Sequence, residues 1–208
     1  MKKIILSLCG LVSFCVASAQ FSVGLNGNFT KYGGYVSKST PGFGVRAAYE
    51  KERYAAVLSF TNGFAITEKS SVDVVHNTNF TTKTVASEVK LNFKTISFMG
   101  NRTLIGDEES AGNFYVGFGA SFVMAKYSEV ITESYDKAYT APEMESGSEN
   151  GLTINGLVGG SYKLGKPAIF GEVGFAFPAN KVGETFVENA IPAHLVFNLG
   201  VKFTFGGE

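Results

Sequence analysis

The sequence predicts an all-β fold, an eight-stranded antiparallel up-and-down β-barrel. Large apolar residues alternate with small or polar residues along most of the 208-residue chain, and alternation is the pattern of a strand because successive side chains point to opposite faces. Eight such runs are separated by alternately short and long connections, and no amphipathic helical pattern competes with them. Glycine, with 25 residues, and phenylalanine, with 19, both exceed ordinary usage.

Each strand is predicted from its own alternation. In chain order the predicted strands are Phe21–Thr30, Gly42–Glu50, Arg53–Phe64, a segment from about Thr84 through Phe98, Asn113–Tyr127, Leu152–Leu164, Ala168–Phe177 and Leu195–Phe205. Their apolar faces hold, in the same order, Phe21, Val23, Leu25 and Phe29; Phe43, Val45 and Tyr49; Ala56, Leu58 and Phe60; Val89, Leu91 and Phe93; Phe114, Val116, Phe118 and Phe122; Leu152, Ile154, Val158 and Tyr162; Ile169, Val173, Phe175 and Phe177; and Leu195, Phe197, Leu199, Val201, Phe203 and Phe205.

The fourth predicted strand changes phase. Leu91 and Phe93 occupy odd positions, whereas Ile96 and Phe98 occupy even ones. One extra residue in a strand moves every later side chain to the other face. We therefore predict a β-bulge near Lys94–Thr95.

The connections predict how the barrel is placed. Those after the second, fourth and sixth strands are short (residues 51–52, 106–112 and 165–167), and those after the first, third, fifth and seventh strands are longer. Short turns on one side and long loops on the other are typical of bacterial outer-membrane barrels. Strands of about ten residues match the length of a tilted transmembrane strand. No strand edge can stay unpaired in hydrocarbon, so the sheet must close.

The polar face distinguishes a transmembrane barrel from a water-soluble barrel of the lipocalin kind. A solvated face is normally rich in lysine and glutamate, whereas here glycine, serine, asparagine and threonine dominate, and charged residues make up only 17% of the chain. We therefore expect the phenylalanine-rich face to contact lipid. Tyrosines are expected near the two membrane interfaces, and the candidates are Tyr49, Tyr54, Tyr127 and Tyr162.

A few charged residues fall on the face that a transmembrane barrel would enclose. Arg46 and Lys202 are basic, and Glu50 and Glu172 are acidic. Buried charges are costly unless they are paired. We predict that at least one pair of opposite sign meets inside the barrel.

Residues 1–19 have the pattern of a cleaved signal peptide. Lys2 and Lys3 precede an apolar run, and Ala17-Ser18-Ala19 forms a small-x-small cleavage site before Gln20. The expected mature domain is residues 20–208. Both cysteines of the chain lie in the signal, in a context that does not fit a lipoprotein signal, so the mature domain has neither disulfides nor thiolate metal sites. Without Lys2 and Lys3, 16 basic residues face 18 acidic ones, which argues against a nucleic-acid partner.

Two segments resemble a known family. The terminal pattern Asn198-x-Gly200-x-x-Phe203-x-Phe205 is similar to the assembly signal of outer-membrane barrels, although Gly206-Gly207-Glu208 follows the last aromatic residue. The segment from Asn113 to Ala120 resembles a strand of OmpA/OmpX-like and Bacteroidetes-type porin-family outer-membrane β-barrel domains. The resemblance implies insertion by the barrel-assembly machinery and residence in the outer membrane.

No motif predicts chemistry. The segment from Gly160 to Pro167 superficially fits a phosphate-binding loop, but Pro167 replaces the metal-binding hydroxyl and a strand follows, so a hairpin turn is predicted. His76 and His194 are the two imidazoles, expected in or near outward loops with Asp73, Ser70 and Ser71. We expect no catalytic, cofactor-binding or metal-binding residue.

The predicted function is a structural or surface-interaction role in the outer membrane, with a lumen filled by side chains. A narrow porin-like channel is the first alternative, and a lipid-modifying enzyme that uses His76 and His194 is the second. Expected partners are outer-membrane lipid and lipopolysaccharide, together with an extracellular ligand bound through the long loops, and the protein is expected to be a monomer. The segment from Ser128 to Asn150, with six acidic residues against Lys137, is either a solvated surface or a cation-mediated contact.

Overall fold

The computed structural model describes residues 20–33, 39–107, 110–144, 146–179 and 193–206. The predicted signal peptide, residues 1–19, lies outside the described residues. The described residues form ten β-strands: β1 (Gln20–Tyr32), β2 (Ser39–Lys51), β3 (Tyr54–Gly63), β4 (Ile66–His76), β5 (Thr82–Ile105), β6 (Gly112–Ile131), β7 (Tyr139–Thr140), β8 (Ser146–Lys163), β9 (Pro167–Pro178) and β10 (His194–Phe205). None of the described residues belongs to a helix long and apolar enough to cross a membrane.

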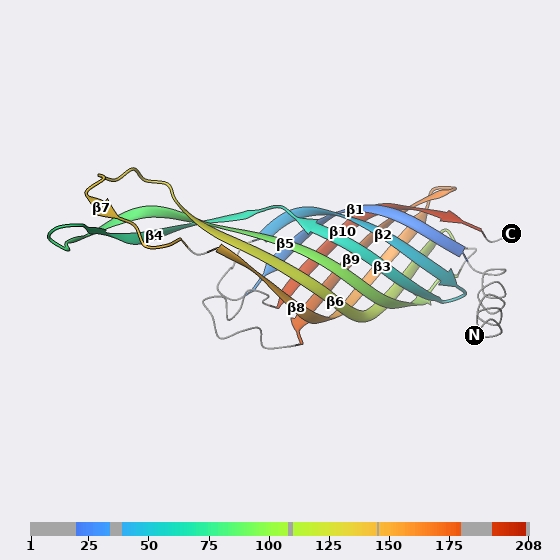
Figure 1. The fold of residues 1–208 in the computed structure, drawn as a ribbon. Coiled ribbons are helices and arrows are strands. Elements are labelled where there is room, and N and C mark those ends of the chain that lie inside the picture. Colours follow the sequence, from blue (N-terminus) through green and yellow to red (C-terminus); the bar gives the residue numbers. More distant parts are fainter. Residues whose placement is uncertain (1–19, 34–38, 108–109, 145, 180–192, 207–208) are drawn as a thin grey trace, which may run out of the picture.

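Eight of the ten strands close into an antiparallel barrel. Neighbours in the chain pair from β1 to β3, β3 pairs with β5, and the ring continues through β6, β8, β9 and β10. β10 then pairs with β1, from Phe21 opposite Phe205 to Tyr32 opposite His194. The start of β1 and the end of β10 therefore lie at the same end of the barrel (Figure 1). The predicted eight-stranded up-and-down barrel is confirmed.

Tight turns join the strands at the end where β1 starts. Lys51 pairs with Tyr54 across the first turn, and Glu52 between them has a positive φ of 54°. Gly106 (φ 85°) and Gly165 (φ 94°) stand in the other two turns, where the left-handed backbone favours glycine. The predicted short connections on this side are confirmed.

A β-ribbon projects beyond the barrel, and the sequence did not predict it. We use "projecting ribbon" for β4, residues 82–91 of β5, residues 127–131 of β6, and β7 (Figure 1). β5 has 24 residues, of which Lys94 to Arg102 pair with β3 in the barrel and Thr82 to Leu91 pair with β4 in the ribbon. The sequence of β4 gives only a weak strand signal, because six of its eleven residues are threonine, serine or charged and the alternation is confined to Val72-Asp73-Val74.

The predicted bulge at Lys94–Thr95 is wrong. The pairing of β5 with β6 runs without a shift from Ser87 to Thr103, and the register shift falls between Thr103 and Ile105. Leu91 and Phe93 are buried, at 8% and 2% exposure, whereas Ile96 and Phe98 are outward and exposed. The change of phase in the sequence therefore has another cause. Leu91 and Phe93 face the lumen at the mouth of the barrel, whereas Ile96 and Phe98 face outward.

The outward face of the barrel carries a continuous belt of exposed apolar side chains. Leu25, Phe118 and Leu199 near its middle are 68%, 68% and 72% exposed. The belt also includes Phe21, Val23, Phe29, Phe43, Val45, Leu58, Ile96, Phe98, Phe114, Phe122, Leu152, Ile154, Val158, Ile169, Val173, Phe175, Phe177, Leu195, Phe197, Val201, Phe203 and Phe205. Water-soluble monomers rarely expose contiguous apolar patches above a few hundred Å². The prediction that the phenylalanine-rich face points out of the barrel is confirmed.

The interior face is small and polar, as predicted. Ser22, Thr30, Ser121, Thr153 and Ser161 are all buried there. Glycine also creates space, because a Cβ on Gly200 would lie 2.6 Å from the ring of Phe170, which fills the lumen. Small residues on some strands therefore accommodate large inward side chains from others.

The tyrosines divide between the two faces. Tyr49, Tyr54 and Tyr162 are exposed near the tight turns, as expected for residues at a membrane interface. Tyr127 is instead partly buried and packs against the apolar cluster at the opposite end of the barrel. The expectation for Tyr127 is therefore wrong, because this residue shares the inward face of β6 with buried Val123 and Ala125.

Replacing Leu25 with arginine tests the outward belt. In lipid vesicles we expect Leu25→Arg to lower the free energy of unfolding by about 2–4 kcal/mol, because a charge at the bilayer midplane loses its hydration. The matched control is Tyr162→Arg at the rim, for which we expect a loss of about 0–1 kcal/mol. Urea titrations of both variants supply the comparison, and equal losses would contradict a belt in hydrocarbon.

Candidate functional site

The lumen contains a buried ion pair at the centre of a hydrogen-bond network. Nη1 of Arg46 on β2 lies 2.7 Å from Oε1 of Glu172 on β9, and the two side chains are only 10% and 5% exposed. Tyr115 donates its hydroxyl hydrogen to the same Oε1 at 2.8 Å, and Asn198 donates its amide to Oε2 at 3.1 Å. The Arg46 guanidinium also lies 4.4 Å from the ring centroid of Phe170. Glu172 is therefore well satisfied despite its burial.

A second ion pair lies nearer the tight turns. Lys202 Nζ is 2.7 Å from Oε1 of Glu50, and Ser22 donates its hydroxyl hydrogen to the same oxygen at 2.7 Å. The prediction that at least one pair of opposite charges meets inside the barrel is confirmed, since both pairs form. Removing one partner of such a pair is costly because it leaves the other charge buried and uncompensated.

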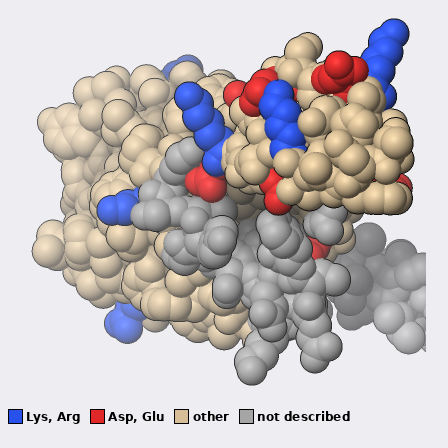
Figure 2. All heavy atoms as spheres, turned by 90° about the vertical axis from the view of Figure 1, so that its left-hand side faces the viewer, with Lys and Arg blue, Asp and Glu red and all other residues tan. Residues whose placement is uncertain are grey.

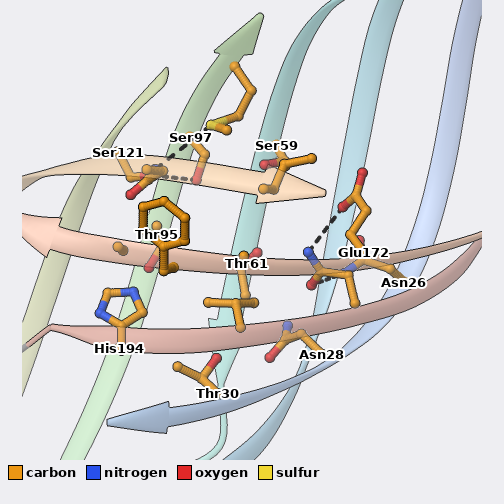
Figure 3. A pocket seen from close by; sticks show the side chains of 18 of the residues that line it. Asn26, Asn28, Thr30, Ser59, Thr61, Thr95, Ser97, Ser121, Glu172 and His194 are labelled. Atoms are coloured by element: carbon orange, nitrogen blue, oxygen red, sulfur yellow. Dashed lines mark hydrogen bonds between the residues drawn. The ribbon is translucent and has the colours of Figure 1, made fainter. Parts of the chain in front are cut away.

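Beyond the Arg46–Glu172 pair the lumen holds a polar cavity of about 100 Å³ (Figure 3). Ser121 donates to Ser97 at 2.7 Å, and Asn155 bonds to Ser121 and accepts from Thr153. In the described part of the chain, neither amide atom of buried Asn28 has a hydrogen-bond partner. A polar cavity of this size has room for ordered water, which occupies about 30 Å³ per molecule in the liquid.

An apolar cluster, which we call the apolar plug, lies in the lumen at the end toward the projecting ribbon and consists of Tyr32, Ile66, Leu91, Phe93, Val123 and Ala125. The rings of Tyr32 and Phe93 stack with their centroids 4.3 Å apart. His194 lies beside the plug, with its ring centroid 5.2 Å from that of Tyr32. The lumen therefore runs from an apolar plug through a polar cavity to two ion pairs, as expected for an eight-stranded barrel whose interior side chains fill it.

The two histidines do not share a site. His194 is buried at the first position of β10, next to the connection from β9 as expected, and its side chain lines the polar cavity (Figure 3). His76 ends β4 on the projecting ribbon, where its Nδ1 accepts the backbone N–H groups of Thr78 and Asn79. Asp73 accepts the hydroxyl hydrogen of Thr84 across the ribbon. The described residues contain no group of three or more His, Cys, Asp or Glu side chains that could hold a metal ion.

The segment from Gly160 to Pro167 is a hairpin turn, as predicted. It comprises the end of β8, a turn containing Gly165 and the first residue of β9. Leu164 N donates to Pro167 O at 2.8 Å and closes the turn. A strand, and not a helix, follows this turn, so the segment lacks the helix N-terminus of a phosphate-binding loop.

Part of the acidic segment after β6 folds back onto the projecting ribbon. Glu133 accepts the Ala86 backbone N–H at 3.0 Å and lies 3.5 Å from Lys83 Nζ. The Ala86 amide, and then Lys83, hold the pKa of Glu133 below its usual range. Glu129 accepts the Ser87 hydroxyl hydrogen at 2.8 Å. Charged side chains gather on the ribbon, whereas the barrel wall beside it is mostly uncharged (Figure 2).

Comparison with known proteins supports the fold, but it assigns the chain to no family. No protein-family model matches the sequence, and no curated protein matches it. A major outer membrane protein of Thermus thermophilus is similar in structure, with a TM-score of 0.58 and 12% identity over 90% of this chain and 100% of that chain. Neisserial surface protein A has a TM-score of 0.55 and 14% identity over 89% of this chain and 97% of that chain. OprG of Pseudomonas aeruginosa has a TM-score of 0.50 and 13% identity over 92% of this chain and 98% of that chain. This chain has the fold of these outer-membrane β-barrels.

Removing the carboxylate of Glu172 tests the buried network. We expect Glu172→Gln to lower the free energy of unfolding by about 3–5 kcal/mol, because Arg46 keeps its charge and loses its counter-ion. The double variant Arg46→Met/Glu172→Met should recover most of that loss, since no unpaired charge remains. Glu133→Gln on the exposed ribbon is the matched control for the loss of a carboxylate. The free energy of unfolding is measured by urea titration. Equal losses in the single and double variants would contradict the coupling between Arg46 and Glu172.

Proposed function

We propose that this chain is an integral protein of a bacterial outer membrane, with a structural or surface-interaction role. The observation that supports this proposal best is the uninterrupted apolar belt around a closed ring of eight strands. A ring without free edges satisfies the backbone hydrogen bonds that hydrocarbon cannot satisfy. The belt and the closed ring together suit a lipid environment and do not suit water.

The projecting ribbon is the part of the protein that we assign to surface interaction. It lies at the end of the barrel opposite the tight turns, where long loops of outer-membrane barrels face the exterior (Figure 1). Contacts such as Thr140 Oγ1 to Asn77 Oδ1 at 2.6 Å and Glu133 to Ala86 hold its chain segments together. A ribbon ordered in this way offers an extracellular partner a surface that is already formed.

The proposal also covers how the protein reaches the membrane and what it contacts there. Residues 1–19 act as the cleaved signal peptide, and the terminal pattern through Phe205 directs the barrel-assembly machinery, as in Bacteroidetes-type porin-family domains. The folded barrel is a monomer in contact with outer-membrane lipid and lipopolysaccharide. Nucleic acid is not among its partners, since acidic residues outnumber basic ones in residues 20–208.

Cell fractionation followed by electrophoresis tests the proposal. We expect the full chain, expressed with residues 1–19, to be recovered from the outer-membrane fraction, and unboiled samples to migrate differently from boiled ones because the closed barrel resists detergent. A variant with a stop codon in place of the His194 codon lacks β10 and cannot close the ring, so it should show no such shift. Recovery of the full chain as a soluble periplasmic monomer would overturn the proposal.

Planar-bilayer recording separates a closed lumen from a narrow channel. We expect the wild-type protein to show no stable single-channel conductance, because the apolar plug and the two ion pairs occupy successive levels of the lumen. A general porin recorded in the same membrane is the positive control. Reproducible steps at the same protein density would favour the porin-like channel.

A further inference from the structure

Three lysines lie on the outward face, just beyond the apolar belt and toward the projecting ribbon. On β5, Ile96 and Phe98 are the last apolar residues of the belt, and Lys94 and Lys90 are outward positions that follow toward the ribbon. On β6, Lys126 follows Phe122 and Met124 in the same direction. All three lysines are exposed. They mark the level at which the barrel surface changes from apolar to polar.

The strand register places the three lysines together. Lys126 pairs with Asn92, which lies midway between Lys90 and Lys94 on the neighbouring strand. Lys126 is therefore the diagonal neighbour of both, with Cα atoms roughly 7–8 Å apart and Cβ atoms somewhat closer. Flexible lysine side chains at this spacing can direct their ammonium groups toward one bound anion.

No acidic side chain neutralises this group within the described part of the chain, where neither an ion pair nor a hydrogen bond involves the three ammonium groups. Glu129 and Glu149 pair with Val89 and Ala125, positions of the opposite face of the sheet. The outward Glu88 lies opposite Lys69 of β4 in the strand register and two residues from Lys90 on the same face of β5, so one acidic side chain faces four lysines there. The three lysines therefore form an excess of positive charge beside the belt.

A groove of about 450 Å³ runs between two of the lysines. β5, β6 and β8 contribute its polar lining, which consists of Lys90, Asn92, Lys126, Tyr127, Ser128, Ser146 and Ser148. Hydroxyl and amide groups can donate hydrogen bonds to the oxygens of an anion held by the ammonium groups. The groove thus combines charge and donors. Lys90, Asn92, Lys126 and Ser128 in its lining lie on the same face of β5 and β6 as the belt residues Ile96 and Phe122.

We propose that Lys90, Lys94 and Lys126 bind a phosphate of a lipid headgroup, with the acyl chains of that lipid lying along the belt at Ile96, Phe98 and Phe122. This inference rests on the proposed membrane location. Phosphate is the anion expected at this depth of a membrane, and lysine is a common point-charge ligand for it. Continuity between the lysines and the belt selects a lipid over free phosphate, because free phosphate has no apolar part to bury.

Native mass spectrometry of the folded barrel in a neutral detergent tests the site. The probes are phosphatidic acid and the diacylglycerol with the same acyl chains, which differ in the phosphate alone, and inorganic phosphate. Each lysine near a phosphate is expected to raise the affinity about fivefold. We therefore expect the wild-type protein to bind phosphatidic acid at least about tenfold more tightly than diacylglycerol. Equal retention of the two lipids would overturn the proposal, and so would inorganic phosphate binding as tightly as phosphatidic acid.

The variant Lys90→Gln/Lys94→Gln/Lys126→Gln should lose that preference. The matched control, Lys51→Gln/Lys137→Gln/Lys166→Gln, removes the same charge from exposed positions elsewhere and should keep it. Each variant is first checked for the electrophoretic shift of a closed barrel, and the wild-type comparison of the two lipids stands even if a variant fails to fold. An unchanged preference in the first variant overturns the lysine site but leaves the membrane location intact. Failure of the wild-type protein to enter lipid vesicles would overturn the proposed function itself.

Discussion

Ring closure is the constraint on which the rest of this structure depends. The pairing of β1 with β10 removes the last free edge of the sheet, so that every barrel strand finds partners on both sides. In hydrocarbon this is a requirement, because an unpaired backbone group costs several kcal/mol there. Once the ring is closed, alternate side chains must face either lipid or lumen, and the sequence assigns large apolar residues to the first and small polar residues to the second.

The enclosed face follows a different rule from the outward face. Eight strands leave a lumen narrow enough for side chains to fill, so each buried charge must find its partner across that space. Arg46 and Glu172 come from opposite parts of the chain and meet with Tyr115 and Asn198 around one carboxylate. The apolar plug around Phe93 places buried apolar side chains in the lumen at the end toward the projecting ribbon.

The parts available for recognition lie beyond the belt. The wall of the barrel offers a mostly uncharged surface, whereas charged side chains gather on the projecting ribbon (Figure 2). The projecting ribbon and the lysine group at its base share β5 and β6, so one pair of long strands connects the lipid-facing belt to both surfaces. The barrel therefore separates an apolar wall from the charged extensions to which we assign surface interaction.

Strand alternation was enough to predict the barrel class, the eight barrel strands and the outward direction of residues such as Phe114 and Phe118, because alternation is a local property of the chain. It also indicated that Arg46 and Glu172 need partners, since burial of a charge is costly in any fold. Three-dimensional packing was needed to show that they pair with each other, that β4 pairs with the part of β5 beyond the barrel, and that Phe93 faces the lumen without a bulge. An apolar residue has the same local pattern against lipid as against a plug, and only the register of neighbouring strands separates the two.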